Sequence, residues 1–94
     1  MTSVDIHKRR NAAVARGVSS TLSAYVDHAS GGTLTDVDGK EWIDFAAGIA
    51  VTSVGNSAPR VVEAVKRQVE LFTHTCFMVT PYEVYVEVCE VLNS

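Results

Sequence analysis

The sequence has little cysteine and no long apolar run. Two cysteines, Cys76 and Cys89, occur among 94 residues, whereas small secreted domains held by disulfides carry more. We therefore expect a reduced chain in the cytoplasm. No apolar run approaches the ~18–20 residues that a membrane helix needs. The basic residues near the N-terminus are not followed by the apolar segment of a secretory signal.

The sequence also lacks an excess of positive charge. Lysine and arginine number 8 and acidic residues number 11, which gives a net charge of −3. This balance argues against nucleic acid or a membrane surface as the main partner. Hydrophobic residues make up 47% and charged residues 20% of the chain. The composition is that of a folded chain.

Complete catalytic and metal-binding motifs are missing as well. There is no phosphate-binding glycine loop, because Gly31 and Gly32 precede a predicted strand instead of a helix. His74 and Cys76 could suggest a zinc site or a nucleophile with its base. No CxxC or HxxxH pair accompanies them, and no orienting acid is marked nearby. We predict that His74 and Cys76 have packing roles. We also predict that the 94 residues include neither metal ligands nor catalytic groups.

What is present is a helix followed by a β region. Residues 5–16 are predicted to form a helix with Ser3 as its N-cap. Three short strands are expected at about 24–29, 33–37 and 41–45. Asp38-Gly39 separates the last two, and Asp-Gly is typical of a type I′ hairpin turn, in which both central residues have positive φ. The pattern predicts a small antiparallel meander.

Two further helices complete an α+β fold. Four apolar residues recur at helical spacing between 59 and 72, with Pro59 in the first turn. A second helix is predicted for 81–92, because Thr80 and Glu83 have the spacing of a capping box around Pro81. The valines at the start of this segment alternate as in a strand, but the cap favours the helix.

Three segments together resemble the N-terminal part of class III pyridoxal-phosphate-dependent aminotransferases. They are DVDGKEWIDFAAGIAVTSVGNSAP, VVEAVKRQV and THTCFMVTPYEVYVEVCEVLN, and the resemblance extends from about residue 9 to residue 94. It implies a fold-type I transferase that is usually a homodimer. About 1–75 would belong to its small domain and about 76–94 would begin its large domain.

The resemblance also implies a reaction and a cofactor. The implied reaction transfers an amino group from 4-aminobutyrate to 2-oxoglutarate, and the cofactor is pyridoxal phosphate. None of Lys8, Lys40 and Lys66 matches the family's Schiff-base lysine motif, so we do not expect these 94 residues alone to hold the cofactor or to catalyse transamination.

Two site residues carry over from the resemblance. Ile49 in GIAV matches an isoleucine that lines the substrate pocket, and Met78 falls where relatives often place a glutamine beside the substrate. A thioether cannot donate the hydrogen bond of that amide. This departure leaves an ornithine-type or other ω-amino-acid aminotransferase open as an alternative. A small α+β interaction module without catalysis is a separate alternative, because these residues contain no complete catalytic set.

Overall fold

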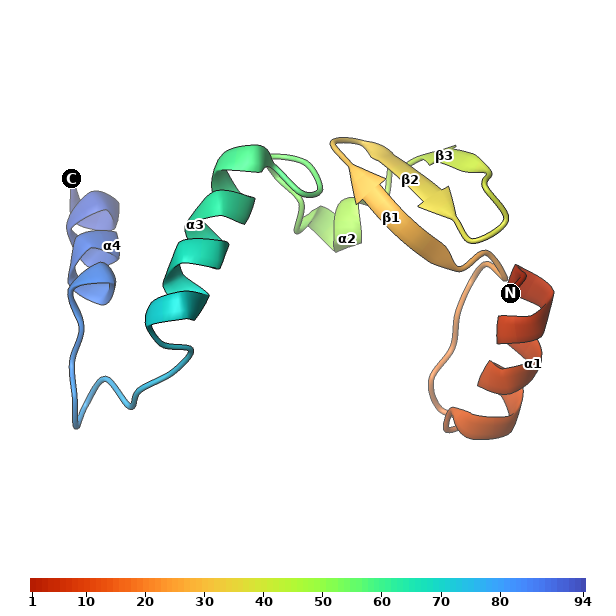
Figure 1. The fold of residues 1–94 in the computed structure, drawn as a ribbon, viewed down its shortest axis with the longest axis horizontal. Coiled ribbons are helices and arrows are strands. Elements are labelled where there is room, and N and C mark those ends of the chain that lie inside the picture. The colour runs from red at the N-terminus through yellow and green to blue at the C-terminus, as the bar shows by residue number, and fades with distance from the viewer. The chain divides into compact units, whose positions relative to one another are not determined.

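A computed structural model describes all residues from 1 to 94 and divides them into two units, Met1–Pro59 and Arg60–Ser94. The elements are α1 (Ser3–Ala13), β1 (Val26–Ser30), β2 (Thr33–Asp36), β3 (Glu41–Ile43), α2 (Ala47–Ala50), α3 (Pro59–Leu71) and α4 (Glu83–Asn93) (Figure 1). The predicted α+β class is confirmed. The domain boundary expected near residue 75 concerns a larger protein and stays a prediction.

The three strands form one antiparallel sheet in the order β1-β2-β3, as the meander prediction required. Leu34 pairs with Trp42 across β2 and β3, and Ala29 pairs with Leu34 across β1 and β2. An irregularity in β1 shifts the register between Val26 and His28. Each strand is shorter than predicted: β1 begins two residues later and ends one residue later, β2 ends one residue earlier, and β3 ends two residues earlier.

The turn between β2 and β3 differs from the predicted type I′. Gly39 has φ +84°, but Asp38 is not among the residues with positive φ. The Gly39 N–H donates to the Asp36 carbonyl at 2.9 Å, and the Asp36 N–H donates to the Lys40 carbonyl at 3.0 Å. The result is a β-turn followed by one left-handed glycine, which is a common three-residue hairpin connection.

The Asp36 carboxylate organises this hairpin from within. It accepts hydrogen bonds from Trp42 Nε1 at 2.8 Å and from the backbone N–H groups of Lys40 and Asp38 at 2.9 and 3.0 Å. The Trp42 hydrogen bond, followed by the Lys40 one, holds the pKa of Asp36 below its ordinary value because both favour the charged carboxylate. Lys40 Nζ lies 3.7 Å from the centroid of the Trp42 ring, which adds a cation–π contact.

Helix α1 begins and ends earlier than predicted. Its N-cap is Thr2 instead of Ser3, and Thr2 forms a capping box with Asp5. Val14 is the C-cap in an extended conformation, so the predicted extension to residue 16 is wrong. The capping box accounts for the start, because the Thr2 and Asp5 side chains each satisfy a backbone N–H of the first turn.

Two contacts attach α1 to the β region. The backbone N–H of Ser3 donates to the carboxylate of Asp38, with both oxygens at 3.2 Å. His7 Nδ1 lies 2.9 Å from the Tyr25 hydroxyl. A carboxylate is favourable at a helix N-terminus, where free N–H groups point outwards. Asp38 therefore stabilises the helix while it belongs to the hairpin.

Helix α3 matches its predicted range within one residue, whereas α4 starts two residues later than predicted. The N-cap of α4 is Tyr82, without a side-chain hydrogen bond. Thr80 belongs to the preceding loop: its N–H donates to the Cys76 carbonyl at 2.9 Å, and its carbonyl accepts from Thr75 Oγ1 at 3.0 Å. The expected capping box is absent because these contacts hold Thr80 outside the helix.

The hydrophobic side chains are not buried among these residues. No hydrophobic residue reaches full burial, and Val65 and Val69 on α3 are each 58% exposed. Isolated helices of this length are marginal in water without packing. Because their side chains are exposed, the apolar faces of α3 and α4 remain available for contacts with residues outside these two helices. None of the helices combines the length and the apolar character needed to span a bilayer.

The Asp36 contacts predict a specific pH dependence. A lowered folded-state pKa means that the charged carboxylate stabilises the hairpin above the unfolded value of about 3.9, and that this stabilisation is lost as pH falls through the lowered value. We expect the fluorescence of Trp42, the one tryptophan of the chain, to report this acid transition at low protein concentration. Asp36→Asn keeps an acceptor oxygen but cannot titrate, so its fluorescence should stay level over the same range. An identical pH course in both chains would contradict this role of Asp36.

Candidate functional site

The segment 44–56, here called the 44–56 loop, connects β3 to the residues before α3 and contains α2 (Figure 1). Its first residue, Asp44, donates its N–H to the Gly32 carbonyl at 2.9 Å. Its last residue, Asn56, exchanges two backbone hydrogen bonds of 2.9 Å with Gly31. Both ends are thus tied to adjacent residues of one hairpin. Compact loops with closed ends of this kind are frequently functional.

The closure of the loop brings two glycines together, and the contact requires glycine at position 55. Gly31 and Gly55 have φ +56° and +86°. A Cβ atom at Gly55 would lie 2.9 Å from the Gly31 Cα, which is closer than real Cβ atoms approach. Gly55 is therefore needed for the two backbones to meet, and Gly31 adopts its positive φ without steric cost.

Within the 44–56 loop the backbone forms a left-handed turn. Ala47, Gly48, Ile49 and Ala50 have φ values of 51°, 62°, 59° and 61°. The Val51 N–H donates to the Ala47 carbonyl at 2.8 Å and so closes the turn. A left-handed conformation costs roughly 1–2 kcal/mol for each residue with a Cβ atom. A strained turn of this kind persists only where its surroundings hold it.

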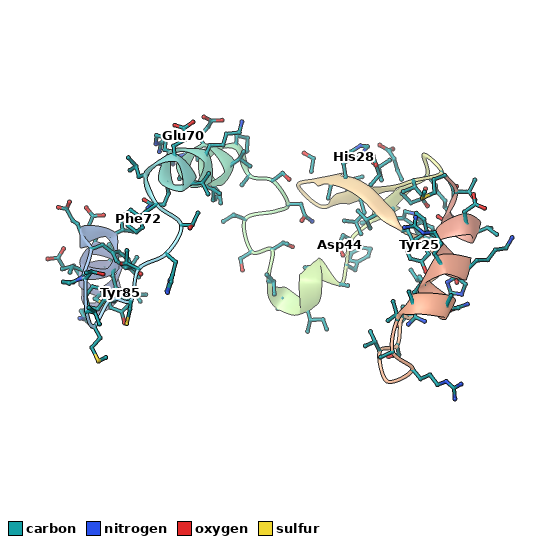
Figure 2. All side chains as sticks on the ribbon, turned by 60° about the horizontal axis from the view of Figure 1, so that its bottom comes forward. Tyr25, His28, Asp44, Glu70, Phe72 and Tyr85 are labelled. Atoms are coloured by element: carbon teal, nitrogen blue, oxygen red, sulfur yellow. The ribbon has the colours of Figure 1, made fainter.

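One side chain holds the start of this turn. Asp44 Oδ1 accepts a hydrogen bond from the Ala47 N–H at 2.9 Å, and Asp44 is half-buried. Figure 2 labels Asp44 where the chain leaves the sheet. The residue therefore connects the sheet, through its own N–H, to the turn, through its carboxylate.

The turn presents Ile49 to solvent. The Ile49 side chain is 91% exposed, although isoleucine is among the residue types most often buried. A β-branched residue at positive φ is a genuine outlier and is associated with functional sites. The structure thus places the predicted residue Ile49 on a strained, exposed turn.

The second predicted residue, Met78, lies in the loop between α3 and α4. Its turn is closed by hydrogen bonds from the Val79 and Thr80 N–H groups to the Cys76 carbonyl, at 3.0 and 2.9 Å. Met78 itself is 88% exposed. The loop therefore presents a flexible, polarisable apolar side chain to solvent.

Four aromatic rings brace this second loop. Phe77 stacks on Tyr85 with ring centroids 4.2 Å apart, and Tyr82 makes edge contacts at 5.5 Å with both Phe72 and Phe77. Phe72 follows α3 and Tyr85 lies on α4 (Figure 2). Pairs of this geometry add about 0.5–1.5 kcal/mol each beyond burial. The rings thus tie the two ends of the Met78 loop together.

Ile49 and Met78 belong to different units, so their joint role in one pocket stays a prediction. His74 and Cys76 are exposed, and both cysteines of the chain are free. The packing role expected of these two residues is therefore not met among these 94 residues. No cluster of three or more His, Cys, Asp or Glu residues could hold a metal ion.

The residues present do not fit pyridoxal phosphate by themselves. The cofactor needs a Schiff-base lysine, a partner for the pyridine nitrogen and a phosphate cradle. Lys40 lies over Trp42, Lys66 Nζ lies 3.4 Å from Glu63 Oε1, and Lys8 is exposed on α1. None of these lysines faces a set of groups that could receive the cofactor.

The fold and the sequence together define the class of protein. The family model described as "Aminotransferase class-III" matches residues 13–94, and the chain belongs to this family, whose members use pyridoxal phosphate. Membership argues against the interaction module as an alternative.

Individual relatives refine this picture. The 4-aminobutyrate aminotransferase of Mycobacterium leprae is 59% identical over 91 residues, which are 97% of this chain and 20% of that protein. The 5-aminovalerate aminotransferase DavT of Pseudomonas putida is 49% identical over 93 residues, covering 99% of this chain and 22% of that protein. The ornithine aminotransferase of Toxoplasma gondii ME49 superposes with a TM-score of 0.74 at 29% identity, covering 80% of this chain and 17% of that one. The chain thus spans about a fifth of the length of these relatives.

The sequence reasoning missed Asp44 and the left-handed turn. A glycine such as Gly48 permits positive φ. Nothing in alanine or isoleucine signals that conformation, because both prefer right-handed or extended backbone. The spacing of Asp44 three residues before Ala47 was the available signal, since Asp side chains bond backbone N–H groups a few residues onwards.

The left-handed turn predicts opposite effects for two alanine-to-glycine changes. Ala50→Gly removes the Cβ clash at positive φ and should stabilise the complete protein by up to about 1 kcal/mol, after the entropy cost of glycine. Ala64→Gly, inside the right-handed helix α3, is the matched control and should destabilise by about 1 kcal/mol. Denaturant midpoints of the two variants and the parent measure this difference. Destabilisation of equal size at both positions would show that residue 50 is not left-handed.

Proposed function

We propose that this chain is part of an enzyme that transfers the amino group of 4-aminobutyrate to 2-oxoglutarate and forms succinic semialdehyde and glutamate. The observation that carries the proposal is the 59% identity to a 4-aminobutyrate aminotransferase over 97% of this chain. The partners would be a small amino donor and an oxo acid. The enzyme would be a cytoplasmic homodimer, with its small domain ending near residue 75.

The contribution of this chain would be one wall of the substrate pocket. Ile49 and Met78 are both apolar, both exposed, and both carried on turns closed by backbone hydrogen bonds. The donor has an aliphatic chain between its amino and carboxylate groups, and each buried methylene contributes about 0.8 kcal/mol. Apolar side chains on fixed turns suit recognition of that chain, while charged groups elsewhere in the enzyme would bind its two ends.

A second candidate is an enzyme for a longer ω-amino acid. It is favoured by the 49% identity to a 5-aminovalerate aminotransferase over 99% of this chain. 5-Aminovalerate has one methylene more than 4-aminobutyrate. Methionine at position 78, where a glutamine amide would donate a hydrogen bond, is compatible with a pocket that accepts a longer apolar chain. Ornithine, which carries an additional charged group, is the third donor to compare.

A donor comparison with the complete, cofactor-loaded enzyme separates these candidates. We expect kcat/KM with 2-oxoglutarate as acceptor to be highest for 4-aminobutyrate. Enzymes discriminate one methylene by roughly 10–200-fold, so 5-aminovalerate should be poorer by at least about tenfold. A higher kcat/KM for 5-aminovalerate or ornithine would replace the first candidate with the second.

Met78 provides the test of the pocket wall. Met78→Gln introduces a donor and an acceptor where the parent has a soft apolar group, so we expect the ratio of kcat/KM between 4-aminobutyrate and 5-aminovalerate to change by about tenfold. Val79→Gln is the matched control, because it places the same amide on the next residue of the same turn. Equal ratios in Met78→Gln and the parent would show that Met78 is remote from the substrate.

A further inference from the structure

Asp44 is the one side chain that hydrogen-bonds to the backbone of the left-handed turn. Its Oδ1 accepts from the Ala47 N–H at 2.9 Å, while its own N–H is bonded to the Gly32 carbonyl at 2.9 Å. The other bonds of the turn run between backbone groups within 46–52 and would move with it. Asp44 thus supplies the link between the fixed sheet and the strained backbone.

We propose that Asp44 is a positioning residue that fixes the direction of Ile49 and thereby sets the preference of the enzyme for the length of its amino donor. The proposal rests on the proposed function, in which Ile49 lines the substrate pocket. Asp44 itself does not touch the substrate in this scheme. It acts by keeping Ala47 to Ala50 at positive φ, with Ile49 at φ 59° and ψ 64°.

The physical argument is a balance between strain and capping. Ala47, Ile49 and Ala50 each carry a Cβ atom at positive φ, and such residues favour a return to right-handed backbone. Without the carboxylate, the Ala47 N–H loses its acceptor. The left-handed conformation at the start of the turn is then no longer favoured over right-handed backbone. When the backbone of the turn relaxes, the Ile49 side chain leaves its present direction. A pocket wall that moves no longer distinguishes donors that differ by a methylene.

The test uses the complete, cofactor-loaded enzyme and the ratio of kcat/KM between its best donor and the donor one methylene longer or shorter. Asp44→Ala should reduce this ratio at least about fivefold, through KM more than through kcat, because apolar contacts to the donor chain are made before the transition state. Asp44→Asn retains an acceptor oxygen and should stay within about twofold of the parent. Asp27→Ala removes an exposed carboxylate of β1 that bonds only His28 and serves as the control.

The same change in the Ile49→Ala background shows whether Asp44 acts through Ile49. Effects of coupled residues are not additive, so Asp44→Ala should alter the ratio by less than about twofold once Ile49 is truncated. A full-sized effect in that background, or an unchanged ratio in Asp44→Ala alone, overturns the proposal.

A double variant keeps the proposal testable if Asp44→Ala does not fold. Asp44→Ala/Ala47→Gly replaces the capped alanine with a residue that adopts positive φ at no steric cost, so it should restore the folded enzyme and part of the ratio. No recovery would overturn the proposal. This test can fail independently of the proposed function. If the parent enzyme prefers 5-aminovalerate, 4-aminobutyrate is refuted as the donor. The ratio of kcat/KM in the variants still measures the coupling of Asp44 to Ile49.

Discussion

The backbone contact between Gly31-Gly32 and the two ends of the 44–56 loop is the constraint on which the first unit depends. The hydrogen bonds of 2.9 Å to Asp44 and Asn56 bring two distant points of the chain to adjacent residues. They fix where the loop leaves the sheet and where it returns. Because the contact is made between backbones at a separation only glycine tolerates, any side chain at Gly55 would push the loop away from the hairpin.

Aspartate carboxylates accept many of the other hydrogen bonds that fix the turns and the helix start in this unit. Asp5 caps α1, and Asp38 accepts a hydrogen bond from the first backbone N–H of the same helix. Asp36 accepts hydrogen bonds within the hairpin, and Asp44 caps the left-handed turn. Each accepts backbone N–H groups that have no partner in regular secondary structure. Part of the acidic excess in the composition is therefore structural. In a unit without a buried hydrophobic core, these polar contacts define the conformation of the turns.

The regular elements followed from sequence patterns, whereas the turns did not. The α3 helix was predicted within one residue, because apolar residues at helical spacing and a proline in the first turn are local signals. The start of α4 was wrong because Thr80 has competing partners in its own loop, and the pattern TPYE cannot reveal them. The hairpin at Asp38-Gly39 was located correctly but given the wrong turn type, since the Asp36 side chain favours a different connection. Ile49 and Met78 came from family resemblance, while Asp44 required the three-dimensional contact.

Both candidate residues combine an exposed apolar side chain with a restrained backbone. Ile49 is held on a left-handed turn by polar bonds, and Met78 is held on a turn braced by aromatic rings. In each case an apolar side chain is presented to solvent at a free-energy cost, and the backbone that carries it is restrained by hydrogen bonds within its turn. Restraint of this kind lowers the entropy that a binding residue would otherwise lose on contact with its ligand. In the proposed pocket wall, Ile49 and Met78 would each lose less conformational entropy on contact with the donor than a side chain on a mobile loop would lose.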